Sequence, residues 1–533
     1  MTRQNSFLFG AMILTVAGLL SRFFGVLYRI PFARLVGAEG IGLYQMAYPI
    51  YTTVLALSTA GLPIAISILV AEKNARGDRW GGRQVLYLAL VLLATLGAVM
   101  SYGLYHWADW LAFQVLHDRR AMYSILAVSP AVFFGAVMSA FRGYFQGLQW
   151  MMPTGVSQVV EQLVRVGTVL TAALLLMSYG VEFAAAGAAF GAVAGGAAGL
   201  ITLLLFYTWF CMRDHAGNKV KSTPREGMVE LTYRLLVLAV PASLGALVMP
   251  VVQTLDAVLV PLRLQVAGFT VEEATGLYGE LSGMAGTLIN LPTIITTAIT
   301  TSLVPAISEA AARGRVKQVG EQLSLALRAS LLLCLPAAVG MWLLAEEIMH
   351  LLYNVPTAGV PLKVLAPSIV FLGMYQVSAG ALQGLGRTML PVRSLIIGAA
   401  FKIFLNYYLT VLPGLGIRGP AIGTNVTFLV AATLNFYSLF GLIGYTPNWV
   451  SLLLKPGLAV TIMGACVIWA NQTLTLAWAL PELTTLAVIA VGMISYGVSL
   501  LLVGGLTTRE LGLIPWIGPR LANVFQDLRW IRG

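Results

Sequence analysis

The chain repeats itself at a spacing of 237 residues, and each copy is long enough to cross a membrane several times. Glu72 recurs as Glu309, and Pro130 recurs as Pro367. The repeat also covers a short motif, since Gln146-Gly147-Leu148 and Gln383-Gly384-Leu385 are both followed by a proline. Internal repeats of this length are common in secondary transporters, whose related bundles enclose a substrate site near the bilayer midplane. The repeat therefore favours movement of a solute over the making or breaking of a bond.

The composition predicts a membrane protein. Of the 533 residues, 58% are hydrophobic and only 10% are charged, and the mean hydropathy is +0.85. Such a chain has too little polar surface for a soluble globule, and helices satisfy every backbone group within lipid. Apolar stretches predict fourteen spans, at residues 7–30, 42–70, 84–105, 121–147, 153–178, 184–210, 231–261, 277–307, 323–344, 364–386, 390–412, 419–443, 451–473 and 484–505. We therefore expect an all-α integral membrane protein with about fourteen transmembrane helices in two related bundles around a central cavity.

Lysines and arginines predict the orientation of these spans. One set of loops, with both termini, carries 21 basic residues, whereas the opposite loops carry six. Because cytoplasmic loops are rich in Lys and Arg, both termini of this multi-pass membrane protein are expected in the cytoplasm. The net charge of +11 then reflects membrane topology, and no nucleic-acid partner is expected.

The repeat and the polar inserts divide the chain into four parts. Residues 1–212 form a first transmembrane lobe with helices 1–6, and residues 213–230 form a cytoplasmic linker. Residues 231–444 form a second lobe with helices 7–12. Residues 445–533 contain helices 13 and 14 and a tail whose apolar spacing over Trp516–Ile531 suits an amphipathic helix on the inner leaflet.

Charged residues inside the predicted spans are the candidate site residues of the first half. A charge at membrane depth costs several kcal/mol unless it is paired or hydrated. The basic residues concerned, with the one acid of this half, are Arg22, Arg29, Arg142, Arg165 and Glu161. A lumen lined by these arginines suits an anionic head group, and pyrophosphate is a natural candidate because Arg binds phosphate bidentately.

Most of these charged residues also have a purely structural interpretation. Arg29 is near a helix end and can snorkel to the surface, and Arg142 can anchor a cytoplasmic helix end. Glu161 and Arg165 are four residues apart, so they can form a purely structural pair. Arg22 lies in the middle of its span, behind Ser21, with no acid in its own helix.

The second half contains a different polar set. Asp256 lies in the seventh span, and Lys402 and Asn406 are four apart on one face of the eleventh. Thr424 falls near the start of the twelfth span. A buried Asp must be paired, protonated or bound to a cation. This set is therefore either an interhelical Asp256–Lys402 ion pair or an ion-coupling site.

No enzyme motif was found in the sequence. It has no HExxH, GxSxG, P-loop or nucleotide-binding pattern, and its four histidines are not spaced as metal ligands. We expect no catalytic residue, no firm metal site and no cofactor.

Several motifs together resemble the MOP superfamily of flippases, and within it the stage V sporulation protein B group and the Gram-positive lipid II flippases. The N-terminal motifs are Ser21-Arg22-Phe23-Phe24-Gly25 and the run Pro31–Ala38. Glu72–Gly77, Phe145–Leu148 and Leu513–Gly518 agree with the same group. The resemblance spans nearly the whole chain.

The resemblance implies two helix bundles around a cavity and transport of undecaprenyl-pyrophosphate-linked sugars, including lipid II. In lipid II flippases a Ser-Arg pair lines the cavity, which corresponds to Ser21 and Arg22, and Arg29 stands one residue from a second family arginine. Some members bind sodium at positions that correspond to Asp256, Lys402, Asn406 and Thr424. Lys402 departs from that pattern, and the cavity arginine of the second family helix has no counterpart between residues 42 and 70.

We therefore expect a flippase of the bacterial cell membrane that moves a polyprenyl-pyrophosphate-linked glycan by alternating access. We expect it to act as a monomer. Its expected partners are the anionic lipid-linked substrate, membrane lipids and cell-wall synthesis enzymes. The alternatives are a cation-coupled multidrug exporter of the related MATE type, a polytopic membrane glycosyltransferase, and a non-transporting scaffold for wall synthesis. The arginine-rich first half disfavours cationic drugs, and the short outer loops disfavour a glycosyltransferase.

Overall fold

The computed structural model describes residues 3–59, 61–214, 227–446, 450–477 and 480–504. Across these ranges the chain is helical, without a strand, as the hydropathy predicts. Most of the predicted linker at 213–230, and the predicted amphipathic tail, lie outside the described residues. Two compact units emerge, one formed by Met1–Met284 with Thr410–Gly416 and the other by Ala285–Leu409 with Ile417–Gly533.

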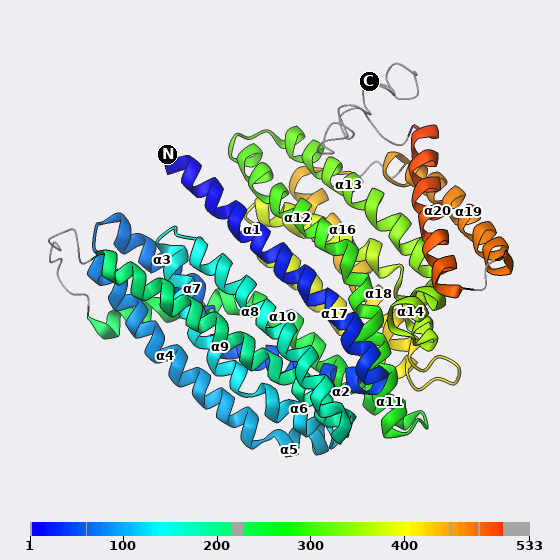
Figure 1. Cartoon of the computed structure of the whole chain (residues 1–533). Helices are drawn as coiled ribbons and strands as arrows, with labels where there is room; N and C mark the ends of the chain where they lie inside the picture. The colour runs from blue at the N-terminus through cyan, green and yellow to red at the C-terminus, as the bar shows by residue number, and fades with distance from the viewer. Residues whose placement is uncertain (1–2, 60, 215–226, 447–449, 478–479, 505–533) are drawn as a thin grey trace. The chain divides into compact units, whose positions relative to one another are not determined.

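The first unit contains eleven α-helices within the described ranges, coloured from blue to green in Figure 1. They are α1 (Arg3–Leu27), α2 (Arg29–Thr59), α3 (Leu62–Ala75), α4 (Arg79–His106), α5 (Ala108–Trp110), α6 (Ala121–Val128), α7 (Pro130–Gly147), α8 (Met152–Leu176), α9 (Val181–Asp214), α10 (Met228–Val266) and α11 (Val271–Tyr278). Helix α8 runs beside α9, and α4 runs beside α7. Two caps show how the sequence starts helices here. Asp78 accepts a hydrogen bond from the Gly81 amide at 2.8 Å to open α4, and a Thr270–Glu273 capping box opens α11.

The second unit contains nine α-helices within the described ranges. They are α12 (Gly286–Ala312), α13 (Val316–Leu343), α14 (Ala345–Tyr353), α15 (Gly359–Leu365), α16 (Ser368–Gly384), α17 (Met389–Leu409), α18 (Arg418–Ile443), α19 (Lys455–Ala477) and α20 (Pro481–Leu502). Helices α17 and α18 pack together, as do α19 and α20, which are orange and red in Figure 1.

The helices are those of a multi-pass membrane protein. Twelve described segments are long and apolar enough to cross a bilayer, and the pair α15 and α16, bent by 44° after a short 3-10 turn, adds a thirteenth. Met12–Leu27 is a shorter apolar helix. Each of the fourteen predicted spans overlaps one of these segments.

The sequence-based boundaries were wrong around the second span. It is not one helix over 42–70, because α2 ends at Thr59 and α3 starts at Leu62. Helix α2 also begins at Arg29, so it includes the end of the first predicted span and the connection predicted at 31–41. It contains one non-helical residue, Gly37, with φ of 69°. Glycine adopts this left-handed conformation without the steric cost that a side chain brings.

The repeat seen in the sequence is a repeat of helices. The starts of α4, α8 and α9 recur 237 residues later as the starts of α13, α17 and α18. The ends of α3, α4 and α7 recur at the same spacing as the ends of α12, α13 and α16. The two units are therefore related bundles.

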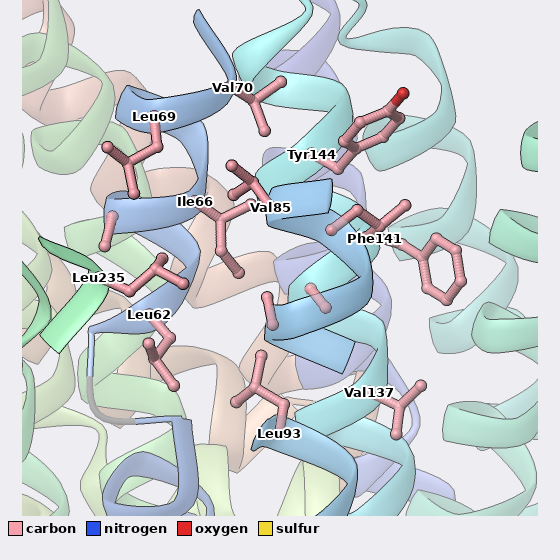
Figure 2. Packing of buried hydrophobic residues seen from close by; sticks show 14 of the residues in the cluster. Leu62, Ile66, Leu69, Val70, Val85, Leu93, Val137, Phe141, Tyr144 and Leu235 are labelled. Carbon is pink, nitrogen blue, oxygen red and sulfur yellow. The ribbon is translucent and has the colours of Figure 1, made fainter. Parts of the chain in front are cut away.

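The hydrophobic core of each unit follows the same repeat. In the first unit, side chains at helical spacing on α3, α4 and α7 meet Leu235 of α10 (Figure 2). Two of these core residues, Val70 and Leu86, correspond at the 237-residue spacing to Ile307 and Leu323, which are buried in the core of the second unit. In lipid, where the solvent is as apolar as the side chains, this close packing is what holds helices together.

Gly42 and Gly279, which are 237 residues apart, lie in contact where α2 crosses the segment after α11. A methyl group on Gly42 would collide with the backbone oxygen of Thr275, and one on Gly279 would collide with the backbone oxygen of Ala38. Gln45 and Ser282, also 237 residues apart, form a hydrogen bond of 3.1 Å at the same crossing. Equivalent positions of the two repeats are thus in backbone contact within the first unit.

Candidate functional site

One face of α8 carries a polar series at four-residue spacing, comprising Ser157, Glu161 and Arg165. This spacing places the three side chains on neighbouring turns of the helix. Glu161 Oε1 accepts a hydrogen bond from Arg165 Nη2 at 2.8 Å, which confirms that this acid and this cation can pair along the helix.

Arg142 of α7 joins the same carboxylate from the neighbouring helix. Its Nη2 lies 2.8 Å from Glu161 Oε2, and its Nε donates to Ser157 Oγ at 3.2 Å. Ser157 Oγ donates in turn to the Thr154 carbonyl at 2.8 Å, so the hydroxyl is fixed as an acceptor for the arginine. Arg142 is therefore part of a network between two helices and does not only anchor a helix end.

The network is largely buried and carries excess positive charge. The side chains of Arg142, Glu161 and Arg165 are 20%, 17% and 11% exposed. One carboxylate faces two guanidinium groups, and the Arg165 Nε is buried without a hydrogen-bond partner. An uncompensated cation at this depth is costly, so the arrangement favours an anion as an additional ligand.

A row of tyrosines extends the network along α2. Arg165 Nη1 donates to the Tyr48 hydroxyl at 3.3 Å, and the Tyr48 ring stacks on Tyr44 with centroids 5.5 Å apart. The Tyr44 and Tyr28 hydroxyls are 3.2 Å apart. Arg29 lies beside Tyr28, Tyr44 and Tyr48. These phenol groups thus connect Arg29 with Arg165.

The sequence-based site prediction did not include this row of tyrosines. Tyr44, Tyr48 and Tyr51 are spaced by four and three residues, which is the signal of one helix face. An aromatic helix face in an apolar chain is usually core, so without the position of Arg165 nothing in the sequence marks these tyrosines as polar ligands.

Helix α1 places Ser21 and Arg22 away from its apolar stripe. The exposed apolar side chains of this helix are Met12, Val16, Leu20, Phe23 and Leu27. At about 100° per residue, Arg22 lies roughly 120° around the helix from the centre of that stripe, near Gly18 and Gly25. The Arg22 side chain is exposed, and Ser21 Oγ is buried without a hydrogen-bond partner. The arginine therefore projects from a face of small residues.

The predicted ion-coupling residues are distributed over both units. Asp256 lies on α10 of the first unit, near Tyr278. In the second unit, Lys402 and Asn406 of α17 are buried and both face Gly423 of α18, which confirms that they share a helix face. The Thr424 hydroxyl donates to the Pro420 carbonyl at 3.0 Å. The Asp256–Lys402 pair joins different units and stays a prediction.

A second polar cluster in the first unit lies outside the candidate spans. Arg120 pairs with Asp118 at 2.8 Å and with Glu39 of α2, and Asp118 also accepts a hydrogen bond from Thr275 of α11 at 2.8 Å. The hydrogen bonds to Asp118 are the main reason that the pKa of Arg120 is raised above its usual value. The cluster ties the segment just before α6 to α2 and α11, and the sequence did not predict it.

Comparison with known proteins gives the family. A model of the family described as polysaccharide biosynthesis protein matches residues 7–311. The chain is 36% identical over 434 residues to stage V sporulation protein B of Bacillus subtilis strain 168, covering 81% of this chain and 83% of that protein. This chain belongs to the polysaccharide biosynthesis protein family. The family is part of the MOP superfamily, as the sequence motifs indicate.

Further matches come from lipid II flippases and from MATE transporters. It is 29% identical over 425 residues to lipid II flippase MurJ of Bacillus subtilis, covering 76% of this chain and 77% of that protein. A MatE family model matches residues 282–408. Among solved structures, an inward closed lipid II flippase MurJ gives a TM-score of 0.69 at 17% identity, covering 92% of this chain and 98% of that chain. An inward-facing MATE transporter gives 0.65 at 16% identity, covering 80% and 94%. These structures show the fold that the family member shares.

Proposed function

We propose that this protein is a flippase that moves a polyprenyl-pyrophosphate-linked glycan across the cytoplasmic membrane by alternating access. The observation that carries the proposal is the Arg142–Glu161–Arg165 network, which leaves one guanidinium charge without a carboxylate at membrane depth. Arginine binds phosphate oxygens with two parallel hydrogen bonds, and a pyrophosphate supplies the compensating negative charge. The name of the lipid II flippase relative agrees with such a substrate.

Arg22 and Ser21 contact the pyrophosphate in this proposal. Arg22 is exposed on α1 and forms no ion pair with any residue that the structure describes. Helix α1 packs on α8, the helix that carries Glu161 and Arg165. The free guanidinium is thus available for a ligand on the helix next to the network.

A MATE-type exporter of cationic drugs is the second candidate, because the MatE model matches residues 282–408. Charge argues against it. The charged candidate site residues of the first unit are four arginines, Arg22, Arg29, Arg142 and Arg165, against the acids Glu161 and Asp256. A cationic drug would be repelled by this excess, whereas a pyrophosphate would be attracted.

Further parts of the proposal concern topology and coupling. Both termini are cytoplasmic, and the lobes of residues 1–212 and 231–444 flank a substrate cavity. The protein works as a monomer without an enzymatic step, and cell-wall synthesis enzymes are its partners. Lys402 pairs with Asp256 in place of a bound sodium ion.

Complementation tests the proposed function. The gene is expressed in a Gram-positive cell whose own lipid II flippases are depleted, and growth and wall synthesis are followed. Restored growth is the expected result. Absence of rescue by a protein that is present in the membrane, together with new resistance to cationic drugs, would support the MATE alternative instead.

A further inference from the structure

The C-terminal end of α4 carries a face of exposed aromatic side chains, which continues through α5 into the π-helical turn Leu111–Val115. Figure 1 shows α5 at the lower end of the first unit. The members of this aromatic face are between 56% and 69% exposed, and they are Tyr102, Tyr105, Trp107, Trp110 and Phe113. An exposed apolar surface of this kind marks a contact with lipid or with another protein.

The opposite face of the same turn attaches it to the helix bundle. Ala108, Ala112 and Leu116 follow one another at four-residue spacing, and all three are fully buried. Both α5 and the π-helical turn pack against α6. The small side chains of the two alanines allow this close approach. The exposed rings of Trp110 and Phe113 therefore point away from the bundle.

An ion pair marks the side of the turn that lies in water. Asp109 Oδ1 is 3.4 Å from Arg119 Nε, and the two side chains are 60% and 74% exposed. Two charges this exposed are stable in water but costly in hydrocarbon. The turn thus has a buried inner face, an aromatic face and a charged edge, which is the pattern of a segment at a boundary between water and lipid.

The aromatic face also continues the lipid-facing side of α4, a helix long and apolar enough to cross a bilayer. Val91, Val99 and Tyr102 are at least 60% exposed. They lie within about 80° of one another around the helix axis. This surface passes from valines in the middle of the span to aromatic rings at its end, as in helices that leave the hydrocarbon through the head-group layer.

The second repeat contains the same turn. Helix α14 corresponds, at the 237-residue spacing, to the turn after α4. Its residues at the inner positions, Ala345, Met349 and Tyr353, are also buried. The residues that follow the two turns, His117 and Asn354, correspond as well, and both are left-handed, with φ of 57° and 58°. The backbone of the turn is therefore a property of both repeats.

The outward face of the turn differs between the repeats. Leu344, which corresponds to Trp107, is buried against α19 and α20. Glu347, which corresponds to Trp110, accepts a hydrogen bond of 2.9 Å from Asn471 of α19. Where helices cover this face, it carries an aliphatic and an acidic residue, and where it is exposed, it carries tryptophans. The fold does not need the rings, so they reflect what surrounds the first unit.

We propose that this aromatic face is a lipid anchor that lies in the head-group layer of the bilayer. Tryptophan and tyrosine favour this layer, because the ring is apolar while its N–H or O–H can bond to water and head groups. The anchor fixes the depth of the connection that carries Asp118 and Arg120, which tie it to α2 and α11. This inference goes beyond the proposed function and does not depend on the transported substrate.

Spin labelling of the purified full-length protein in phospholipid vesicles tests the proposal. The free cysteines Cys211, Cys334 and Cys466 are replaced by alanine. A spin label is then attached to Trp110→Cys or to Phe113→Cys. Collisions of the label are measured with oxygen, which concentrates in lipid, and with a nickel chelate, which stays in water.

Val91→Cys and Arg119→Cys provide the controls, because their native side chains are 65% and 74% exposed, one on the lipid-facing side of α4 and one in the ion pair. Labels at positions 110 and 113 are expected to give oxygen-to-nickel ratios between those of the two controls. Nickel access equal to that of Arg119→Cys would overturn the proposal and place the face in water. Few collisions with either reagent would also overturn it, because a second copy of the chain would then cover the face.

A label at Tyr105→Cys provides a second measurement. Adding Trp110→Ser with Phe113→Ser removes the anchor, so nickel access at position 105 should rise towards that of Arg119→Cys. Trp469→Ser is the matched control, because Trp469 is 68% exposed on α19 of the other unit and should leave the label unchanged. An unchanged ratio in the double serine variant would overturn the proposal. Because no transport is measured, failure here is distinct from failure of the flippase proposal.

Discussion

Glu161 forms ion pairs with arginines from two helices, so the burial of both cations depends on one carboxylate. Glu161→Gln leaves Arg142 and Arg165 buried without an acid, so we expect a loss of about 3 kcal/mol in the free energy of unfolding. Glu309→Gln is the matched control, because Glu309 pairs with Arg313 at the same four-residue spacing and 2.7 Å but is 64% exposed. That change should cost about 0.5 kcal/mol or less. Thermal unfolding in detergent compares the two, and equal losses would contradict the buried network.

Arg22 is expected to act on the substrate and not on folding. Its side chain is exposed, so Arg22→Ala should leave the unfolding temperature unchanged while flipping is abolished. Arg22→Lys should restore only part of the activity, because a bidentate fork becomes a point charge. Transport of a fluorescent lipid-linked glycan by reconstituted protein measures this. Normal transport by Arg22→Ala would remove Arg22 from the site.

At the residue scale, the sequence predicts charges but not their partners. The Glu161–Arg165 pair followed from helix periodicity. Arg142 was predicted as a site residue, but its ion pair with Glu161 was not, because this contact joins α7 to α8 and depends on how two helices pack. The tyrosines of α2 were missed for the same reason. Their polar role depends on Arg165, which lies on the neighbouring helix α8 and donates a hydrogen bond to Tyr48.

At the scale of helices, the crossing of α2 with the segment after α11 depends on two glycines. Gly42→Ala and Gly279→Ala each place a methyl group against a backbone oxygen, which cannot move as a side chain can. We expect each change to lower the free energy of unfolding by about 1–3 kcal/mol.

Gly103 of α4 provides the control for this prediction. No atom lies within 4 Å of the methyl group that Gly103→Ala would add, so its unfolding temperature should be unchanged or slightly raised. The unfolding temperatures of Gly42→Ala, Gly279→Ala and Gly103→Ala test this prediction. Stability of Gly42→Ala equal to that of Gly103→Ala would show that the helices are farther apart than described.

Helix positions were predictable and helix breaks were not. Apolar length alone located every span, because hydrocarbon thickness sets the length of each helix. The break between α2 and α3 was missed because it interrupts no apolar stretch. The left-handed Gly37 also looks like any other of the 55 glycines, since a positive φ leaves no mark in composition.

At the scale of the whole molecule, Lys402 predicts how transport is coupled. Its side chain is 9% exposed and lies on one face of α17 with Asn406. We propose that Lys402 pairs with Asp256 in place of a metal ion, so transport should proceed at nearly the same rate when sodium is replaced by potassium. Strict dependence on sodium would contradict the Asp256–Lys402 pair. Lys402→Ala should be more harmful than replacing both residues by apolar ones, because the single change leaves an unpaired charge.

The sequence predicts the class of the molecule because hydropathy and an internal repeat are properties of the whole chain. The substrate is harder to predict, because it depends on which arginines meet around one lumen. Arg22, Arg142 and Arg165 lie on three different helices, so the common role that we propose for them depends on how these helices pack.

The most direct test of the flippase proposal is transport by the purified protein in vesicles. Polyprenyl-pyrophosphate-linked glycan, the same glycan on a neutral lipid, and a cationic drug are offered separately, and movement across the bilayer is measured for each. The arginine network predicts rapid movement of the pyrophosphate-linked glycan and little movement of the other two. Transport of the cationic drug, or equal movement of the neutral lipid, would contradict the account.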